Sequence, residues 1–156
     1  PSVFALLPNL IERGGVGRHG HGSITSIYTV LAEGDDASDP IVDIARASLD
    51  GQVMLSRRLA DQAHYPAIDL NGSISRVMQA LVSPEELKQS NKLRRLWSVY
   101  QQNADLVQVG AYEAGSNPEL DEAIRLREQI VDFLRQDMDK GEDYAMTRNQ
   151  LHHMLS

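Results

Sequence analysis

The 156-residue sequence contains no cysteine, which excludes a disulfide framework and thiolate metal sites. It also has no apolar run approaching the ~20 residues that are needed to span a bilayer. Basic residues are outnumbered, with 15 Lys and Arg against 22 Asp and Glu, and the net charge is -7. This balance argues against broad nucleic-acid binding through the surface field of the protein.

A phosphate-binding loop is missing as well. Gly15 and Gly20 have the spacing of the two glycines in the pattern G-x-x-x-x-G-K-[ST], but His21 occupies the lysine position and Gly22 follows it. Without the lysine there is no charge for the β- and γ-phosphates. We therefore predict that this glycine-rich segment is a flexible surface connector.

No metal site is predicted. His19 and His21 would need further ligands, and the sequence indicates none. The acidic turn that contains Asp35 and Asp36 lacks the glycine and the terminal glutamate of a calcium-binding EF-hand loop, and Pro40 stands at its sixth position. Turn and helix-capping roles are the better interpretation of these acids.

The first residues, PSVFALLPNLIERGG, have an apolar patch but neither a basic region nor a small-residue cleavage site. They do not form a signal peptide. The sequence also begins without methionine, in what reads as a passage from strand to helix. We expect it to be a piece of a longer protein.

The first half of the chain alternates between strand and helix patterns. Ser23–Leu31 has the Ile, Thr, Tyr and Val content of a strand, and Asp39-Pro40 is a favourable helix start. A short strand at Gln52–Leu55 and a helix at Ser56–Ala63 follow. This alternation indicates an α/β fold with parallel strands.

The second half is predicted to be helical. Ser83-Pro84-Glu85-Glu86 is a capping box, and the helix behind it places an apolar stripe on one side. The stripe consists of Leu93, Leu96, Trp97, Tyr100 and Ala104. A further helix begins at Asn117-Pro118 and is predicted to end at Lys140-Gly141, and a last short helix is capped by Thr147. The apolar face predicted for the helix after Asn117 is Leu120, Ala123, Ile124, Val131, Leu134 and Met138.

The most specific stretch is residues 49–78, LDGQVMLSRRLADQAHYPAIDLNGSISRVM, which places a turn at Tyr65-Pro66 and a Gly72-containing loop before Arg76. Together with GSITSIYTVLAEGDDASDPIVD upstream, it resembles the flagellar and type III secretion export ATPases, relatives of the rotary ATP synthase catalytic subunits. The resemblance runs from residue 1 to about residue 156. It implies the C-terminal portion of a RecA-like parallel-sheet nucleotide-binding domain at 1–81, followed by a small all-helical domain at 82–156.

The resemblance also implies roles for three side chains. In the related synthase catalytic subunit the tyrosine matching Tyr65 lies against the adenine ring, although residue type alone favours a core or turn tyrosine. Tyr112, in VGAYEAG, is the candidate by position for a second aromatic in the adenine pocket. Arg76 matches the arginine that reaches the γ-phosphate of a neighbouring subunit, a role that suits a planar guanidinium. The alternative for Arg76 is a surface salt bridge at a helix start.

By resemblance, the whole enzyme hydrolyses ATP with Mg²⁺ as a homo-hexameric ring at the cytoplasmic face of the export apparatus. Its expected partners are a stalk subunit, a regulator and export chaperones, with no nucleic acid and with membrane association only through the export machine. The phosphate loop and metal-holding acid lie upstream in such enzymes. The present chain alone is expected to be inactive and to bind no nucleotide tightly.

A second hypothesis is a non-catalytic helical binding module that contacts a stalk subunit or an export chaperone. The helices after Val82 would carry the contact, with Trp97, Tyr100 and Tyr112 as aromatic anchors.

Overall fold

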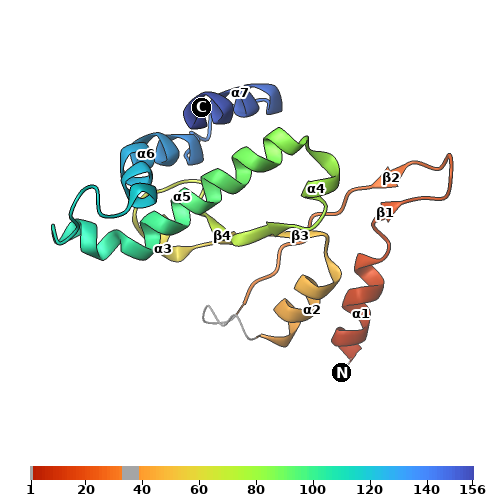
Figure 1. Cartoon of the computed structure of the whole chain (residues 1–156). Helices are drawn as coiled ribbons and strands as arrows, with labels where there is room; N and C mark the ends of the chain where they lie inside the picture. Colours follow the sequence, from red (N-terminus) through yellow and green to blue (C-terminus); the bar gives the residue numbers. More distant parts are fainter. Residues whose placement is uncertain (1, 33–38) are drawn as a thin grey trace. The chain divides into compact units, whose positions relative to one another are not determined.

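The computed structural model describes residues 2–32 and 39–156, so the predicted turn acids Asp35 and Asp36 lie outside the described residues. The chain divides by packing into two compact units, residues 1–52 and 53–156 (Figure 1). This division by packing does not test the predicted boundary after residue 81 between a nucleotide-binding domain and a helical domain. That boundary stays a prediction.

The first unit contains helix α1 (Ser2–Ile11), a hairpin of strands β1 (Gly15–Val16) and β2 (Ser23–Ile24), and helix α2 (Pro40–Ser48). The glycine-rich segment that we predicted to be a connector forms the hairpin turn. Its strands pair antiparallel, with Gly15 opposite Ile24. The antiparallel pairing follows from the six-residue connection, which can join antiparallel strands but is too short for a parallel crossover.

The long strand predicted over Ser23–Leu31 is wrong in extent, since only Ser23 and Ile24 are in a strand. Residues 25–32 have no regular structure, and Ile27 and Leu31 are 92% and 89% exposed. A β-branched composition favours an extended backbone, but a ladder also needs a neighbouring strand. Among the described residues, β1 is the neighbour that pairs with β2, and it is two residues long.

Helix α2 begins where the sequence predicts. The Asp39 carboxylate accepts a hydrogen bond from the Ile41 N–H at 2.7 Å, and Pro40 occupies the first helical position, where its missing N–H costs nothing. Ala45 is the buried residue of this helix.

The second unit carries most of the secondary structure. Strand β3 (Gly51–Leu55) leads into it and pairs with β4 (Ile68–Ser75) in a two-stranded sheet. Its helices are α3 (Arg57–Asp61), α4 (Met78–Leu81), α5 (Pro84–Gln108), α6 (Pro118–Leu134) and α7 (Tyr144–Leu155). Figure 1 shows α5 as the long helix against which α6 and α7 lie.

The loop predicted around Gly72 is instead part of strand β4. A Cβ atom at Gly72 would lie 3.1 Å from the Asp69 carboxylate and 3.3 Å from the Met54 Cβ atom. The glycine therefore permits a close approach between the two strands, which is a recognised use of glycine inside a strand. The Asp69 carboxylate also accepts hydrogen bonds from the N–H groups of Asn71 and Gly72.

The hydrophobic core lies among the last three helices. Its buried members are Leu93, Leu96, Trp97 and Tyr100 from α5, Ala123, Leu126 and Ile130 from α6, and Leu155 from α7. The stripe predicted on α5 is confirmed, with Ala104 at its partly buried edge. Because Trp97 and Tyr100 are core residues, the hypothesis that they serve as anchors for a binding partner is wrong.

The predicted course of α6 needs correction. The helix ends at Leu134, well before Lys140, and Met138 is fully exposed. Arg135 leaves the helix with an extended backbone, φ -92° and ψ 145°, and the next amide donates to a loop of the same unit. Tertiary hydrogen bonds thus end the helix early. Helix α7 likewise begins earlier than predicted, because Asp143, and not Thr147, caps it by accepting from the Met146 N–H at 2.8 Å.

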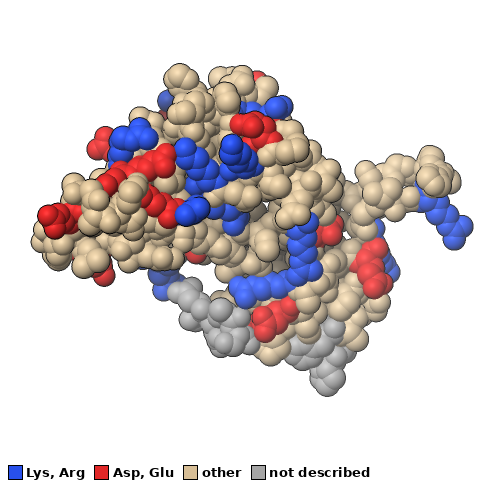
Figure 2. All heavy atoms as spheres, in the orientation of Figure 1, with Lys and Arg blue, Asp and Glu red and all other residues tan. Residues whose placement is uncertain are grey.

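Acidic and basic side chains are interspersed over the helices of the second unit (Figure 2). Lys92 pairs with Glu122 at 2.9 Å, and Arg95 pairs with Glu119. Exposed pairs of this kind contribute little stability, so this surface is a mixed, solvated face. Over the described ranges, no helix has the length and apolar content required to cross a membrane.

Candidate functional site

The loop after α3, residues 63–66, presents the side chain of Tyr65 and is called the Tyr65 loop below. The Tyr65 side chain is exposed, with 56% of the residue accessible to solvent. Its hydroxyl donates a hydrogen bond to the Ala60 carbonyl at 3.3 Å, and the Tyr65–Pro66 peptide bond is cis. An exposed aromatic ring on an ordered loop is a surface on which a planar ligand can stack.

The Tyr65 loop begins as a helix C-cap. Ala63 has a φ of +52°, the left-handed conformation typical of the residue just past a helix end. The Ala63 N–H donates to the Ala60 carbonyl and the His64 N–H donates to the Leu59 carbonyl, each at 2.9 Å. These two bonds form a Schellman motif, whose usual apolar contact joins the positions that Leu59 and His64 occupy here. Both side chains are buried.

Three contacts fasten the Tyr65 loop to the helices. The His64 ring packs against the Trp97 ring of α5, with 6.4 Å between the ring centroids and 41° between the planes. The Arg135 guanidinium donates to the Ala63 carbonyl at 3.3 Å, and the Gln136 N–H donates to the Tyr65 carbonyl at 3.0 Å. Three successive residues of the loop are thus held by residues far away in the sequence.

His64 is 4% exposed and interacts electrostatically with the Arg135 cation. Burial lowers the pKa of His64 below its ordinary value of 6.5, and the positive charge of Arg135 lowers the pKa further. The imidazole is therefore neutral at physiological pH, which suits its packing against the indole ring of Trp97.

Arg76 lies directly after β4 and is exposed. The end of that strand is fixed through Ser73, whose carbonyl accepts a hydrogen bond from the Arg94 guanidinium of α5 at 2.6 Å. The Ser73 hydroxyl accepts from the Met54 N–H at 2.9 Å and donates to the Asp69 carbonyl at 2.6 Å. Helix α5 therefore holds the strand that precedes Arg76, as it also holds the Tyr65 loop.

Tyr112 lies in the connection between α5 and α6, and its hydroxyl is engaged within that connection. It donates to the Asp121 carboxylate at 2.8 Å and lies 3.1 Å from the Asn117 carbonyl. Asp121 also accepts from the Gly115 N–H at 3.0 Å. These contacts fold the loop onto the start of α6. The role of Tyr112 as a second aromatic beside adenine stays a prediction.

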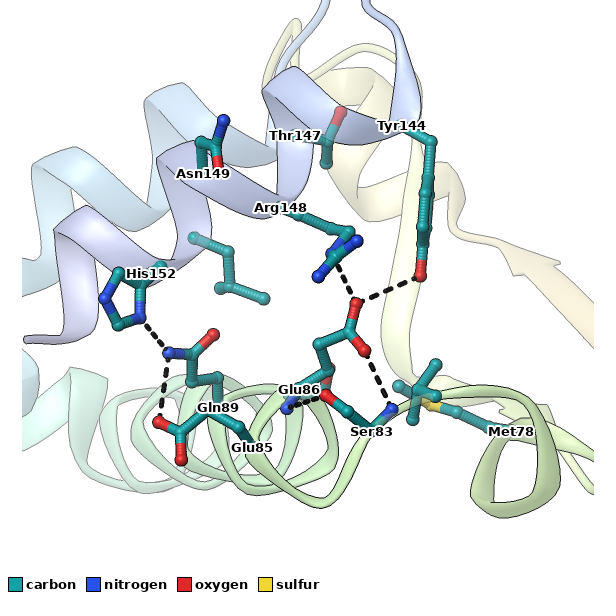
Figure 3. Close-up of a pocket in the computed structure, with 13 residues that line it drawn as sticks. Met78, Ser83, Glu85, Glu86, Gln89, Tyr144, Thr147, Arg148, Asn149 and His152 are labelled. Atoms are coloured by element: carbon teal, nitrogen blue, oxygen red, sulfur yellow. Dashed lines mark hydrogen bonds and ion pairs between the residues drawn. The ribbon is translucent and has the colours of Figure 1, made fainter.

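A groove of about 370 Å³ separates the start of α5 from α7 (Figure 3). Glu86 lies at its centre, where it accepts from the Ser83 N–H at 2.8 Å and pairs with Arg148. Hydrogen bonds from Ser83, aided by the charge of Arg148, hold the pKa of Glu86 below its ordinary value. Across the groove, the Gln89 amide forms a hydrogen bond with His152. These polar groups satisfy one another and fasten α7 to α5.

The described residues include no group of three or more His, Asp or Glu side chains placed to hold a metal ion. Of the predicted site residues, Tyr65 has an exposed side chain and Arg76 is an exposed residue. Helix α5 contacts both neighbourhoods, through Trp97 beside His64 and through Arg94 on the Ser73 carbonyl. The sequence did not reveal His64, Arg94 or Gln136 as positioning groups, because their contacts cross 21 to 71 residues of sequence.

Comparison with known proteins gives matches across nearly the whole chain. Residues 1–75 match the family model for the ATP synthase alpha/beta family, nucleotide-binding domain. Residues 82–153 match the model for the T3SS EscN ATPase C-terminal domain. The flagellum-specific ATP synthase of Pseudomonas aeruginosa is 53% identical over 156 residues, which is all of this chain and 35% of that protein. The flagellum-specific ATP synthase of Salmonella typhimurium is 55% identical over 144 residues, 92% of this chain and 32% of that protein.

Solved structures agree. The assembled ATPase EscN of the enteropathogenic E. coli type III secretion system matches with a TM-score of 0.94 and 41% identity, over 100% of this chain and 37% of that one. EscN in complex with its central stalk EscO matches with a TM-score of 0.88 and 39% identity, over 100% of this chain and 36% of that one.

The first half of the chain is thus of the ATP synthase alpha/beta nucleotide-binding class, and the helical second half is of the EscN C-terminal type. The predicted fold class is confirmed. The chain belongs to the flagellar and type III secretion export ATPases and corresponds to the C-terminal part of such an enzyme. It spans about a third of the length of the relatives that it matches.

Proposed function

We propose that this chain completes the nucleotide site of an ATP-hydrolysing export ATPase by supplying Tyr65 to the adenine ring and Arg76 to the γ-phosphate of a neighbouring subunit. The observation that carries the proposal is the exposed side chain of Tyr65 on a loop whose backbone and neighbouring His64 ring are held by contacts on three successive residues. The family supplies ATP as the ligand, since the similar proteins are named as ATP synthases and ATPases.

Tyr65 contributes binding energy through its ring. A base stacked on an aromatic side chain gains on the order of 1–3 kcal/mol relative to alanine. The 3.3 Å hydrogen bond of the hydroxyl is long and made on an exposed surface, so it adds little to the position of the ring. Binding of adenine therefore depends on the ring and not on the hydroxyl.

Arg76 contributes to the reaction and not mainly to binding. Its guanidinium is always charged and can form two parallel hydrogen bonds to phosphate oxygens. It acts in trans within a homo-hexameric ring, where negative charge develops on the transferred phosphoryl group. Arg76 follows strand β4, and Arg94 of α5 holds that strand through the Ser73 carbonyl. The backbone from which the Arg76 side chain extends therefore has a defined position.

Mg²⁺ is bound elsewhere in the enzyme. Among the residues that the structure describes, no group of three or more His, Asp or Glu side chains is placed to hold a metal ion. The ligands of Mg²⁺ and the phosphate loop belong to the part of the enzyme outside this chain. The 156 residues alone are accordingly inactive as an ATPase and bind nucleotide weakly.

The enzyme works with a stalk subunit at the cytoplasmic face of a flagellar or type III export apparatus. This follows the likeness to EscN, which has been solved with its central stalk EscO. A regulator and export chaperones complete its set of partners. Contact with the membrane is made through the export machine.

The test is the affinity of the full-length enzyme for ATP. Tyr65→Ala is expected to raise the Kd for ATP at least about fivefold, which corresponds to the loss of ~1 kcal/mol of stacking. Tyr65→Phe is the matched control, because it keeps the ring, and its Kd should stay within about twofold of wild type. Equal weakening by both substitutions would show that Tyr65 acts through its hydroxyl, and the stacking role would be wrong.

A further inference from the structure

We propose that His64 is a positioning residue for the nucleotide base: its buried ring, packed on Trp97, sets the position in which Tyr65 meets adenine. The inference rests on the proposed function of Tyr65. It adds a residue that does not touch the ligand and acts only through its neighbour in the chain.

The first observation is the opposite environment of two consecutive side chains. His64 is 4% exposed, whereas Tyr65 is 56% exposed. The His64 ring lies 6.4 Å from the Trp97 ring, and Trp97 is itself part of the core between α5 and α6. Because adjacent residues share a backbone, a side chain fixed in the core limits the orientations open to the next one.

The second observation is that the backbone on either side of His64 is held as well. The Ala63 carbonyl accepts from Arg135, and the Tyr65 carbonyl accepts from the Gln136 N–H. Arg135 and Gln136 directly follow α6, which ends early to reach these carbonyls. The loop is thus clamped between α5 on one side and the end of α6 on the other.

This arrangement has a direct consequence for affinity. A ligand that stacks on a mobile ring must also restrict that ring, and this ordering weakens binding by an amount that a rigid loop avoids. Because the contacts of His64, Arg135 and Gln136 form when the protein folds, the Tyr65 loop is already ordered before the ligand binds. Loss of the His64 ring should therefore weaken binding of the base and leave binding of the phosphates unchanged.

A purely structural role for His64 predicts something different. In that case its removal would lower the stability of the unit and affect all ligands alike, whether or not Tyr65 is present. The two roles are separated by comparing a ligand that has a base with one that lacks it, in the presence and absence of the Tyr65 ring.

The experiment measures the Kd of the full-length enzyme for Mg-ATP and for Mg-tripolyphosphate, which has no base. His64→Ala is expected to raise the Kd for ATP roughly fivefold and to leave the Kd for tripolyphosphate within about 1.5-fold. In a Tyr65→Ala background, His64→Ala should change neither value by more than about 1.5-fold, because residues that act through one another are not additive.

Two further variants keep the test decisive if His64→Ala folds poorly. His64→Phe keeps a ring against Trp97 and should restore the ATP affinity to within about twofold of wild type. Arg135→Ala removes an exposed side chain that donates to the Ala63 carbonyl, and should raise the Kd for ATP roughly twofold only when Tyr65 is intact.

The failures are distinguishable. If Tyr65→Ala leaves the Kd for ATP unchanged, the proposed function of Tyr65 is wrong, and the positioning role of His64 falls with it. If Tyr65→Ala weakens ATP binding while His64→Ala and Arg135→Ala do not, only the positioning role is overturned. An equal loss for ATP and tripolyphosphate, or the same loss in the Tyr65→Ala background, would also overturn it.

Discussion

Ala63→Gly should stabilise the second unit, although Ala→Gly normally destabilises a protein. Ala63 has a φ of +52°, and among the described residues it is the non-glycine residue with a positive φ. The left-handed conformation costs an L-residue about 1–2 kcal/mol, which glycine avoids. Glycine also increases the conformational entropy of the unfolded chain, which offsets about 0.4–1 kcal/mol of that gain. The net expectation is a gain of about 0.8 kcal/mol in the free energy of unfolding, the middle of a range from about 0 to 1.6 kcal/mol.

The assay is urea unfolding of the 156-residue chain followed by tryptophan fluorescence. Trp97 is the one tryptophan in the sequence and lies in the core of the second unit, so its emission reports on that unit. Ala60→Gly is the matched control, because Ala60 lies inside α3, where glycine should cost about 0.5–1 kcal/mol. Destabilisation of similar size by both substitutions would refute the argument from the left-handed cap.

Two further predictions concern the same unit. Burial, and after it the charge of Arg135, lowers the folded-state pKa of His64 below its ordinary value of 6.5. The neutral imidazole therefore contributes stability that is present above pH 6.5. This stability is lost as the pH falls toward the folded-state pKa. Between pH 7.5 and 5.5, His64→Gln should therefore lose less stability than wild type in urea unfolding, and identical losses would contradict this. Ser83→Ala should cost about 1 kcal/mol, because the Ser83 hydroxyl caps the Glu86 N–H at 3.3 Å, and an unchanged midpoint would show that the capping box adds nothing.

The local features of this fold could be predicted because short-range chemistry determines them. Asp39, Ser83 and Asn117 each cap a helix by accepting from an N–H two or three residues ahead. The apolar stripe of α5 follows from helical spacing in the same way. Neither kind of feature depends on where the rest of the chain lies.

Features that depend on distant partners were missed. The segment after Ile24 has the composition of a strand, but strand pairing in this unit stops with the two residues of β1. Helix α6 ends at Leu134 because the Gln136 N–H bonds to the Tyr65 carbonyl, 71 residues away. Composition and periodicity contain no information about such partners.

In the candidate site, too, local motifs were predicted and contacts with distant residues were missed. Tyr65 and Arg76 were found through the resemblance, which compares short motifs. The clamp around Tyr65 was not found, although one local signal existed. His64 occupies the position past a helix end where an apolar residue usually packs back on the helix, and that position pointed to a buried ring.

Arg76 is proposed to act in trans on the transferred phosphoryl group, and subunit mixing in the full-length enzyme tests this catalytic role most directly. Arg76→Ala should lower kcat on the order of 10³-fold with a smaller effect on KM, since the side chain stabilises charge that develops during transfer. Arg76→Ala subunits mixed with subunits that keep Arg76 but lack the phosphate-loop lysine should regain activity, because about a quarter of the interfaces in an equal mixture then pair two intact halves. Rings of Arg76→Ala that hydrolyse ATP at the normal rate, or a mixture that stays inactive, would contradict the account.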